Sequence, residues 1–255
     1  MMNLGPRFLK VWRRDLLTFL KTWKVNFIPP FLEPVLYLLA LGLGLGSFID
    51  NIEGVSYARY IAPALVSISI MNASFFETTY SSYVRMYYQK TFDAIISTPV
   101  SIEEVIAGEL FWAATRSLIY ATLMFPVLIA FGVIDLPTSF FIIPFALLAG
   151  LLFAGIGMCF TAITPSIEAL NYPSFLFITP MFLFSGTFFP LDLLPEVVQK
   201  VALAVLPLAH VVLINRAFTL GEIHTGLLWS FAWIVVATLI ICTLAIVLMR
   251  RRLIV

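Results

Sequence analysis

The sequence predicts an all-α integral membrane protein with six transmembrane helices. Of its 255 residues, 61% are hydrophobic and only 11% are charged, and the mean hydropathy is +1.02. A soluble domain of this length cannot bury so much apolar surface, so the composition is typical of a multi-pass membrane protein. Six apolar runs, each near the ~20 residues that a helix needs to cross a bilayer, and a strong asymmetry of lysine and arginine around them support this fold class.

Residues 1–26 are predicted to form an amphipathic interfacial helix and cytoplasmic lead, followed by a membrane domain over 27–255. On a helical wheel, one continuous sector holds the aromatic residues and leucines Phe8, Leu9, Trp12, Leu16, Phe19, Leu20 and Trp23. The basic residues outside that sector are Arg7, Lys10, Arg13, Arg14, Lys21 and Lys24. Such a helix places its apolar face in the acyl boundary and its basic face toward headgroups or a soluble partner. A basic tail that only orients the chain is the alternative.

The six apolar runs define predicted spans at 27–49, 60–82, 109–131, 140–163, 169–189 and 227–249. We expect the third span to continue as a helix back toward Ile102. With the N-terminus inside, eleven of the 15 lysines and arginines lie on the inner side, three lie outside, and Arg116 lies within the third span. This asymmetry predicts that both termini are cytoplasmic.

The fifth predicted span does not end as a simple helix. Gly186, Pro190 and Pro195 interrupt the apolar sequence, which then continues with few charges to Pro207. Glycine and proline break a helix, whereas the apolar character keeps the segment at the membrane. The sequence therefore predicts outer re-entrant helices over about 186–207, between spans five and six, with these three residues marking an outer gate.

A short amphipathic segment follows the second span on the inner side. Phe92, Ile95 and Ile96 share one face of a helix that is expected to end before Pro99. A soluble motor can grip such a helix, or the helix can lie on lipid, and periodicity does not separate the two interpretations. The candidate coupling residues over 91–98 are Thr91, Phe92, Asp93, Ile95, Ile96 and Thr98.

Four charged residues fall inside the membrane segments: Glu33, Glu77, Glu109 and Arg116. At a helical rise of ~1.5 Å per residue, three of them lie at similar depths, roughly 6–9 Å from the inner surface. A lone charge at that depth is costly, so we expect Arg116 to pair with Glu77 or Glu33. The cluster is either a latch or polar cargo gate, or a structural ion pair that holds the first three spans together.

Tyr80, Tyr83 and Tyr87 recur at helical spacing near the inner end of the second span. Tyrosine is enriched at membrane interfaces, and this belt role explains the pattern. Stacking of a cargo sugar ring on the same face is the functional alternative.

The chain carries no motif for ATP hydrolysis, because none of its five lysines follows a glycine as a phosphate-binding loop requires. No metal site is expected, since His210 and His224 lack neighbouring ligands at suitable spacing, and we assign them no role. Cys159 and Cys242 fall inside apolar runs and are not expected to form a disulfide. No catalytic constellation is evident, so the chain is not expected to be an enzyme or to bind a cofactor. A net charge of +1 gives no reason to expect a nucleic-acid partner.

Several stretches, in order along the chain, resemble type 2 ABC exporter permeases. They are FLEPVLYLLALGLGLG (31–46), FETTYSSY (76–83), GELFWAATRS (108–117), ITPMFLFSGTFFPLDLLP (178–195), LPLAH (206–210) and the terminal LMRRRLIV. Within these permeases the chain looks most like the NodJ-like branch of nodulation-factor and lipooligosaccharide exporters.

This resemblance implies a homodimer in the plasma (cell inner) membrane that meets two copies of a separate ATP-binding ABC subunit. ATP and Mg²⁺ would be bound by that subunit. The helix around 91–98 would be the coupling helix, and re-entrant helices would close the outer end of the pathway. The implied cargo is amphiphilic: a lipid-linked oligosaccharide, lipooligosaccharide or polysaccharide, or, in other branches, drugs or lipids.

The function expected is therefore the membrane permease of an ATP-driven exporter, with its pathway lined by spans one, two and five. A secondary carrier or channel is one alternative, but it predicts charges at the bilayer midplane and not near the inner face. A non-transporting membrane scaffold is the other, and it would need neither an outer hairpin nor a cytoplasmic coupling helix.

Overall fold

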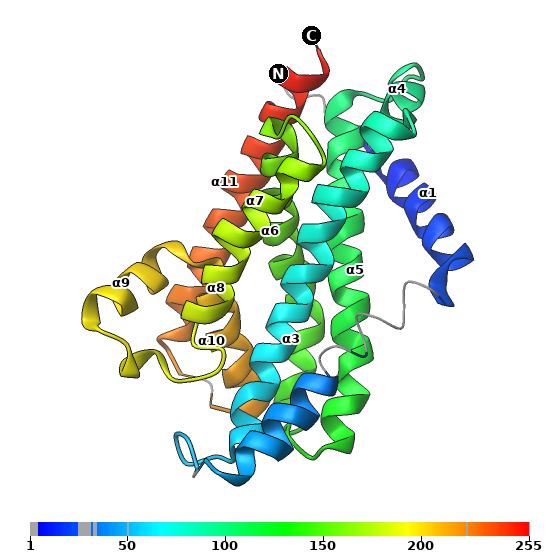
Figure 1. Cartoon of the computed structure of the whole chain (residues 1–255). Helices are drawn as coiled ribbons and strands as arrows, with labels where there is room; N and C mark the ends of the chain where they lie inside the picture. Colours follow the sequence, from blue (N-terminus) through cyan, green and yellow to red (C-terminus); the bar gives the residue numbers. More distant parts are fainter. Residues whose placement is uncertain (1–4, 25–31, 33–34, 50, 223, 255) are drawn as a thin grey trace.

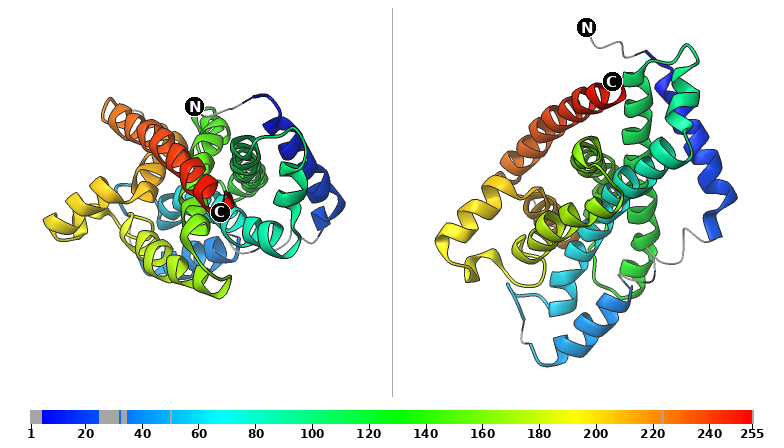
Figure 2. Two further views of the ribbon diagram at one scale, coloured as in Figure 1. Left: turned by 90° about the horizontal axis from the view of Figure 1, so that it is seen from above. Right: turned by 45° about the horizontal axis from the view of Figure 1, so that its top comes forward.

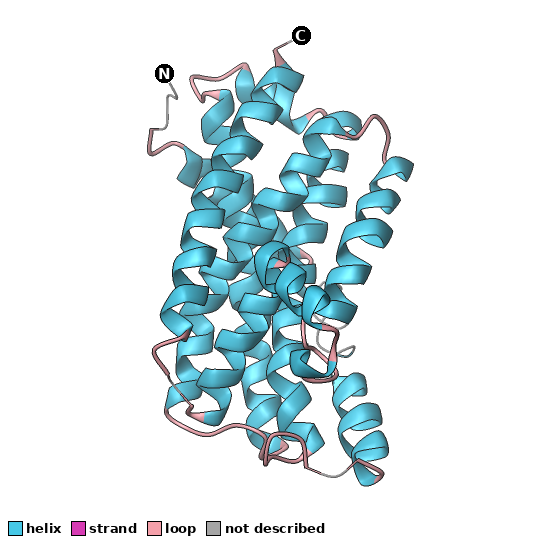
Figure 3. Ribbon diagram, turned by 90° about the vertical axis from the view of Figure 1, so that its left-hand side faces the viewer, coloured by secondary structure: helices cyan, strands magenta, loops and turns pink. Residues whose placement is uncertain are grey.

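The computed structural model describes residues 5–24, 32, 35–49, 51–222 and 224–254, and the regular elements in these residues are helices (Figure 3). The start of α1 (Phe8–Lys21), the short α4 (Thr91–Ile96) and the end of α11 (Leu227–Leu253) lie at one end of a bundle of long helices (Figure 1). This end is called the α4 end below. Glu33 and most of the first half of the first predicted span fall outside the described residues.

In the described part of the chain, four helical runs are long and apolar enough to cross a membrane. Their bounds are Tyr57–Tyr88, Ile102–Ala130, Thr138–Ile163 and Leu227–Leu253. The first run joins α3 (Tyr57–Phe76) to two π-helical turns, η3 (Glu77–Ser81) and η4 (Val84–Tyr88). The second is α5, and the third joins η5 (Thr138–Phe141) to α6 (Ile142–Ile163). Four of the six predicted spans therefore lie in long apolar helices.

The other two predicted spans take less regular forms. Within the first, the described helix is Val35–Ser47, which contains η1 (Leu38–Gly44) and η2 (Leu45–Ser47). The fifth is a chain of short pieces that ends at Phe184, before the predicted residue 189. These pieces are η6 (Glu168–Leu170), α7 (Asn171–Pro173), η7 (Ser174–Ile178) and α8 (Thr179–Phe184).

The segment after α8 extends further than the sequence predicts. It contains η8 (Leu191–Leu193), α9 (Glu196–Val205) and α10 (Pro207–Leu220), with a bend of 90° between the last two helices. If this bent pair counts as one span, five helices are able to cross a membrane among the described residues. Pro207, where the predicted re-entrant segment ends, occupies the first turn of a new helix, where proline is well tolerated.

A capping box explains where α5 begins. The Ser101 hydroxyl accepts a hydrogen bond from the Glu104 amide at 3.2 Å, and the Glu104 carboxylate accepts one from the Ser101 amide at 2.9 Å. This reciprocal arrangement satisfies two amides that the helix itself leaves without partners. The helix starts at Ile102 and confirms the predicted extension of the third span.

The interior of the bundle is centred on α3, which contacts α5, α6 and α10. Large buried side chains such as Tyr60, Phe75 and Phe153 fill this core. In contrast, α1 and α9 lie on opposite sides of the bundle (Figures 1 and 2). α1 packs on α5 so closely that a Cβ at Gly108 would lie 2.6 Å from the Val11 Cβ. Small residues permit this kind of close helix approach in membrane proteins.

Gly157 of α6 makes a similarly close contact with α3. A Cβ at this position would lie 2.8 Å from the Phe75 carbonyl oxygen, a backbone atom that cannot rotate away. We expect Gly157→Ala to destabilise the fold by about 1–3 kcal/mol through overpacking. Thermal unfolding of the purified protein in detergent measures the loss. Gly44→Ala is the control, because nothing lies within 4 Å of a Cβ there. Equal melting temperatures for both variants would contradict the packing argument.

Candidate functional site

A buried cluster of charged side chains lies between α1, the η3–η4 segment and α5, toward the α4 end of the bundle. It contains Glu77, Glu109 and Arg116, three of the four charged residues singled out in the sequence. It also contains three that the sequence analysis did not place there: Arg14, Asp15 and Arg85. These six residues are called the charge cluster below.

Glu77 is only 3% exposed, and donors surround its carboxylate. Oε1 lies 2.8 Å from Arg85 Nη1 and accepts a hydrogen bond from Trp112 Nε1 at 3.0 Å. Oε2 pairs with Arg116 Nη1, which confirms one of the two partners predicted for this arginine. Whether the pair acts as a gate or only as a structural tie stays a prediction.

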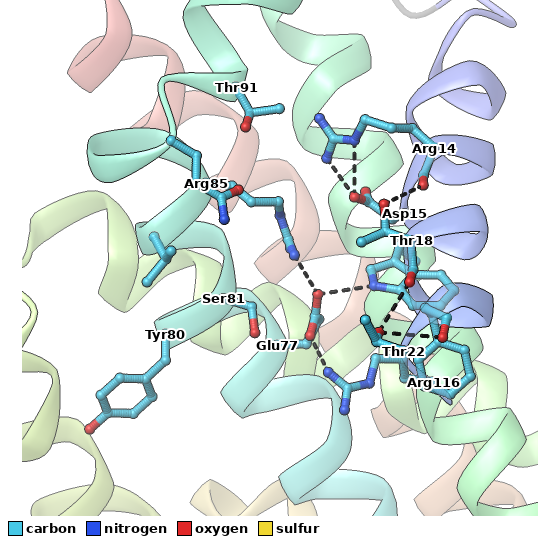
Figure 4. Close-up of a pocket in the computed structure, with 14 residues that line it drawn as sticks. Arg14, Asp15, Thr18, Thr22, Glu77, Tyr80, Ser81, Arg85, Thr91 and Arg116 are labelled. Carbon is cyan, nitrogen blue, oxygen red and sulfur yellow. Dashed lines mark hydrogen bonds and ion pairs between the residues drawn. The ribbon is translucent and has the colours of Figure 1, made fainter. Parts of the chain in front are cut away.

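Glu109 is fully buried and connects all three elements. Its Oε1 accepts a hydrogen bond from Arg14 Nη2 of α1 at 3.0 Å. Its Oε2 accepts from Ser82 Oγ at 2.8 Å and from Arg85 Nε at 3.0 Å. Arg85 binds Glu77 (Figure 4) and also binds Glu109, so it joins the two halves of the cluster. Planar guanidinium groups suit such two-sided recognition of carboxylates.

Asp15 is the acidic residue that α1 contributes to the cluster. It is 5% exposed, pairs through Oδ1 with Arg14, and its Oδ2 has no hydrogen-bond partner. Burial, and then the nearby Glu109 carboxylate, raise the pKa of Asp15 to about 7 against the opposing effects of Arg85 and Arg14. With Asp15 ionised, three arginines face three carboxylates and the charges balance.

Two features of the sequence point to Asp15 and Arg85 as members of the charge cluster. Asp15 is the lone acid in a basic amphipathic helix, where an acid on the packing side calls for partners. Arg85 follows Glu77 by about two helical turns and so returns to a similar side of the helix. Counting Arg85 only as an inner-surface charge obscured this relation.

A cavity of about 480 Å³ opens beside the charge cluster. Its lining residues come from α1, the η3–η4 segment, the start of α4, and α5: Arg14, Asp15, Thr18, Phe19, Thr22, Glu77, Tyr80, Ser81, Val84, Arg85, Gln89, Thr91, Trp112 and Arg116. Figure 4 shows Glu77 between Arg85 and Arg116, with Arg14 and Asp15 facing them from α1. This volume falls in the range of small-molecule sites.

The three predicted tyrosines do not form one platform. Tyr80 lines the cavity, but its ring points away from the charge cluster and its hydroxyl donates to Asn171 Oδ1 at 2.8 Å (Figure 4). Tyr83 is buried, stacks on Tyr87 with ring centroids 4.6 Å apart, and donates to the Pro165 carbonyl. Tyr87 accepts a hydrogen bond from Arg252 at 2.7 Å. These partners tie the segment to the inner loop and to α11.

The predicted coupling segment forms α4, but Phe92 requires a correction. Its side chain is fully buried in a core with Val105 and Ile106 of α5, so it anchors α4 and does not face a partner. Its apolar ring packs inward because α4 is too short to stand free of the bundle. Ile95 and Ile96 are half-buried. The exposed surface of 91–98 comes from Asp93, Ala94, Ser97 and Thr98, and Thr91 is partly exposed.

The proposed gate residues lie at the opposite end of the bundle. Gly186 has a φ of +71°, and its carbonyl accepts a hydrogen bond from Arg216 Nη2 of α10 at 2.8 Å. The same guanidinium lies 3.8 Å from the centre of the Tyr60 ring. Pro190 and Pro195 directly precede η8 and α9, respectively. Arg216 thus ties the turn after α8 to α3 and α10, a contact that the sequence analysis did not foresee.

The two histidines have separate surroundings. His210 is buried, contacts Ser230 Oγ at 3.1 Å and the Leu203 carbonyl at 2.8 Å, and stacks on Trp233. His224 is exposed, and its Nδ1 lies 3.3 Å from the Glu222 carbonyl oxygen. Within the described part of the chain, no three metal-ligating side chains come together.

The Arg116–Glu77 ion pair should stabilise the fold only while both partners are present. Arg116→Ala leaves the Glu77 carboxylate buried with one cation fewer, and we expect a loss of about 3–5 kcal/mol in unfolding free energy. The double variant Glu77→Gln/Arg116→Gln removes both charges and should recover much of that loss. The free energy of unfolding in detergent is measured for Arg116→Ala and for the double variant. The single variants Glu77→Gln and Arg116→Gln, measured in the same way, complete the double-mutant cycle. Additive effects of the single changes would contradict coupling.

Asp15 should make stability depend on pH. Its folded pKa of about 7 exceeds the ordinary value of 3.8, so the folded state holds a proton that the unfolded state releases between these values. The unfolding free energy is therefore expected to fall as pH rises from about 4 to about 7. Melting temperatures across pH 5–8 should show this decline in the wild type and a smaller one in Asp15→Asn. Identical pH profiles would rule out Asp15 as the source.

The sequence profile described as ABC-2 type transporter matches residues 6–217. The chain is 37% identical to Nodulation protein J of Rhizobium meliloti (strain 1021) over 225 residues, covering 88% of this chain and 86% of the relative. It is 35% identical to Nodulation protein J of Rhizobium leguminosarum bv. viciae over 255 residues, covering 98% and 96%. The inner membrane transport permease YadH of Escherichia coli (strain K12) is 24% identical over 196 residues, 76% of each chain. The chain belongs to the ABC-2 type transporter family.

Proposed function

We propose that this chain is the membrane permease of an ATP-driven exporter that moves an amphiphilic cargo out across the plasma (cell inner) membrane. The observation that carries the proposal is the family match over residues 6–217, together with relatives named as Nodulation protein J that align over almost the whole chain. Long apolar helices and a short helix exposed at one end of the bundle support it.

In the proposed topology the membrane domain over 27–255 crosses six times and both termini are cytoplasmic. The predicted first and fifth spans would complete the set with the four long helices, and the bent pair α9–α10 would be the re-entrant element on the outer side. The inner side would be the α4 end. Arg250, Arg251 and Arg252 in the last turn of α11 support this orientation, because basic residues favour the cytoplasmic face. The lead over 1–26 would lie at the inner surface.

The proposed partner is an ATP-binding ABC subunit, in two copies, that binds ATP and Mg²⁺ and meets α4 of each permease in a homodimer. The exposed surface of α4, with Asp93, Ala94 and Thr98, is what such a subunit would touch. Phe92 would transmit the motion inward, because its ring is packed against α5. The pathway would form between the two permeases and be lined by spans one, two and five.

The proposed cargo is a lipid-linked oligosaccharide, lipooligosaccharide or polysaccharide. The resemblance to the nodulation-factor branch and the name of the curated relatives favour this class. Drugs or lipids, which related exporters carry, are the alternative. Lipid and glycolipid analysis of the inner leaflet and of exported material, in cells with and without the gene, separates these cargo classes.

Coupling through α4 predicts a selective defect. Asp93→Arg reverses a charge on the exposed surface, and we expect it to reduce cargo-stimulated ATP hydrolysis of the reconstituted complex about tenfold or more while the permease stays folded. Phe92→Ala is the matched variant, since it opens a cavity in the core and should lower the melting temperature as well. ATP-dependent transport that is unchanged in Asp93→Arg would contradict this docking surface.

The same reconstitution separates the rival functions. The permease alone should hydrolyse no ATP, and transport should require a separate ATP-binding ABC subunit. Transport driven by an ion gradient without that subunit would indicate a secondary carrier. Absence of cargo movement under every condition, with normal assembly of a larger complex, would indicate a scaffold.

A further inference from the structure

The cavity beside the charge cluster has an uneven charge on its walls. Three arginines line it, whereas only two carboxylates do, Asp15 and Glu77. The third carboxylate, Glu109, is fully buried and does not line the cavity. The surface that faces the cavity is therefore richer in guanidinium groups than the cluster as a whole.

Hydrogen-bonding capacity at this surface is not used up within the protein. Arg14 Nη1 and Arg116 Nε are buried and have no hydrogen-bond partner. Thr18, Ser81 and Gln89 add hydroxyl and amide groups to the walls. Unpartnered buried guanidinium nitrogens cost free energy, and an oxyanion that accepts their hydrogen bonds would remove that cost after a small side-chain adjustment.

Apolar surface lies beside these polar groups. Phe19, Val84 and Trp112 also line the cavity. On the exposed side of α1, the helix that contributes Phe19 to the cavity, Leu17 is 49% and Leu20 is 55% exposed. A ligand with a charged head and an acyl chain matches this division better than a fully polar solute does.

We propose that this cavity binds the phosphate headgroup of an anionic amphiphile drawn from the inner leaflet. The assignment rests on the proposed function in one respect, the placement of α1 at the inner membrane surface. Guanidinium groups bind phosphate through paired, charge-assisted hydrogen bonds, and Arg14 and Arg116 supply them from two sides of the cavity. The acyl chain leaves between α1 and the bundle and stays in lipid.

Asp15 opposes the bound anion. The charged groups that face it are Arg14 on α1, Arg85 on η4 and Glu109 on α5. Its carboxylate lines the cavity and, when ionised, repels a phosphate bound there. The site therefore predicts effects of opposite sign: loss of the Arg14 charge weakens binding, whereas loss of the Asp15 charge strengthens it. If Arg14 and Asp15 had only a structural role, loss of either charge would not change the binding affinity in opposite directions.

The experiment titrates purified full-length permease in a neutral maltoside detergent and counts bound molecules by native mass spectrometry. The probes are dioctanoyl phosphatidic acid, dioctanoylglycerol and inorganic phosphate. We expect one tight site for phosphatidic acid, about tenfold weaker in Arg14→Gln and tighter in Asp15→Asn. Arg13→Gln is the matched control, because the neighbouring Arg13 is exposed and does not line the cavity.

A steric variant tests the location independently. Ser81→Phe fills the cavity from η3 and should abolish tight binding, whereas Ser47→Phe adds the same ring at an exposed position at the other end of the bundle and should not. Melting temperatures of all variants identify any that fail to fold. The double variant Arg14→Gln/Asp15→Asn removes one charge of each sign and provides a folded form that lacks the Arg14 contact.

Several results would overturn the assignment. Equal affinity for dioctanoylglycerol would show that phosphate is not recognised, and equal affinity for inorganic phosphate would show that the ligand is a free anion. Equal weakening by Arg14→Gln and Arg13→Gln, or equal binding by Ser81→Phe and Ser47→Phe, would place the ligand elsewhere. Because the permease is tested without an ABC subunit, a negative result leaves ATP-coupled transport untouched, and failure of coupling leaves the binding result intact.

Discussion

The balance of three arginines against three carboxylates is the constraint on which the α4 end of this protein depends. These charges lie between helices in an apolar chain, where an isolated charge is strongly unfavourable. Each of the three elements contributes one arginine and one carboxylate, and ion pairs cross between them, so the whole cluster is satisfied only when α1, the η3–η4 segment and α5 are together. Electrostatics therefore hold a surface helix on the bundle at a point where lipid supplies no hydrophobic force between helices.

Close helix packing at two glycines, together with the ion pairs, holds the helices of the bundle together. Gly108 lets α1 approach α5, and Gly157 lets α6 approach α3. The η3 and η4 turns lie between the buried part of α3 and the exposed α4, in the same stretch that carries Glu77 and Arg85. π-Helical turns are common at functional sites, because the extra residue redirects side chains. Movement of α4 would therefore reach the charge cluster through a short and irregular stretch of chain.

The two ends of the bundle use different means to hold their irregular segments. At the α4 end, Phe92 and the charge cluster fix a short helix and a surface helix. At the other end, hydrogen bonds to backbone carbonyls help to hold the turn after α8: Arg216 binds the Gly186 carbonyl and lies over Tyr60, and the Tyr57 hydroxyl donates to the Phe188 carbonyl. In the proposed topology, one end responds to a soluble partner and the other closes over the pathway.

The sequence by itself determined the fold class and most of the long helices. Apolar runs of membrane length are a local property of the sequence, and they predicted that the third span continues as a helix back toward Ile102, where α5 begins. The intramembrane positions of the charges predicted that Arg116 pairs with Glu77 or Glu33, because a buried charge requires a partner, and the structure shows the pair with Glu77.

Only the tertiary structure decided which partners completed the site and which surfaces stayed exposed. Arg14 and Asp15 are distant in sequence from Glu109, and their approach to it depends on how α1 lies across α5. The inward turn of Phe92 and the burial of α10 beyond Pro207 depend in the same way on neighbouring helices. Periodicity defines the faces of a helix, but the packing of the whole bundle decides which face is covered.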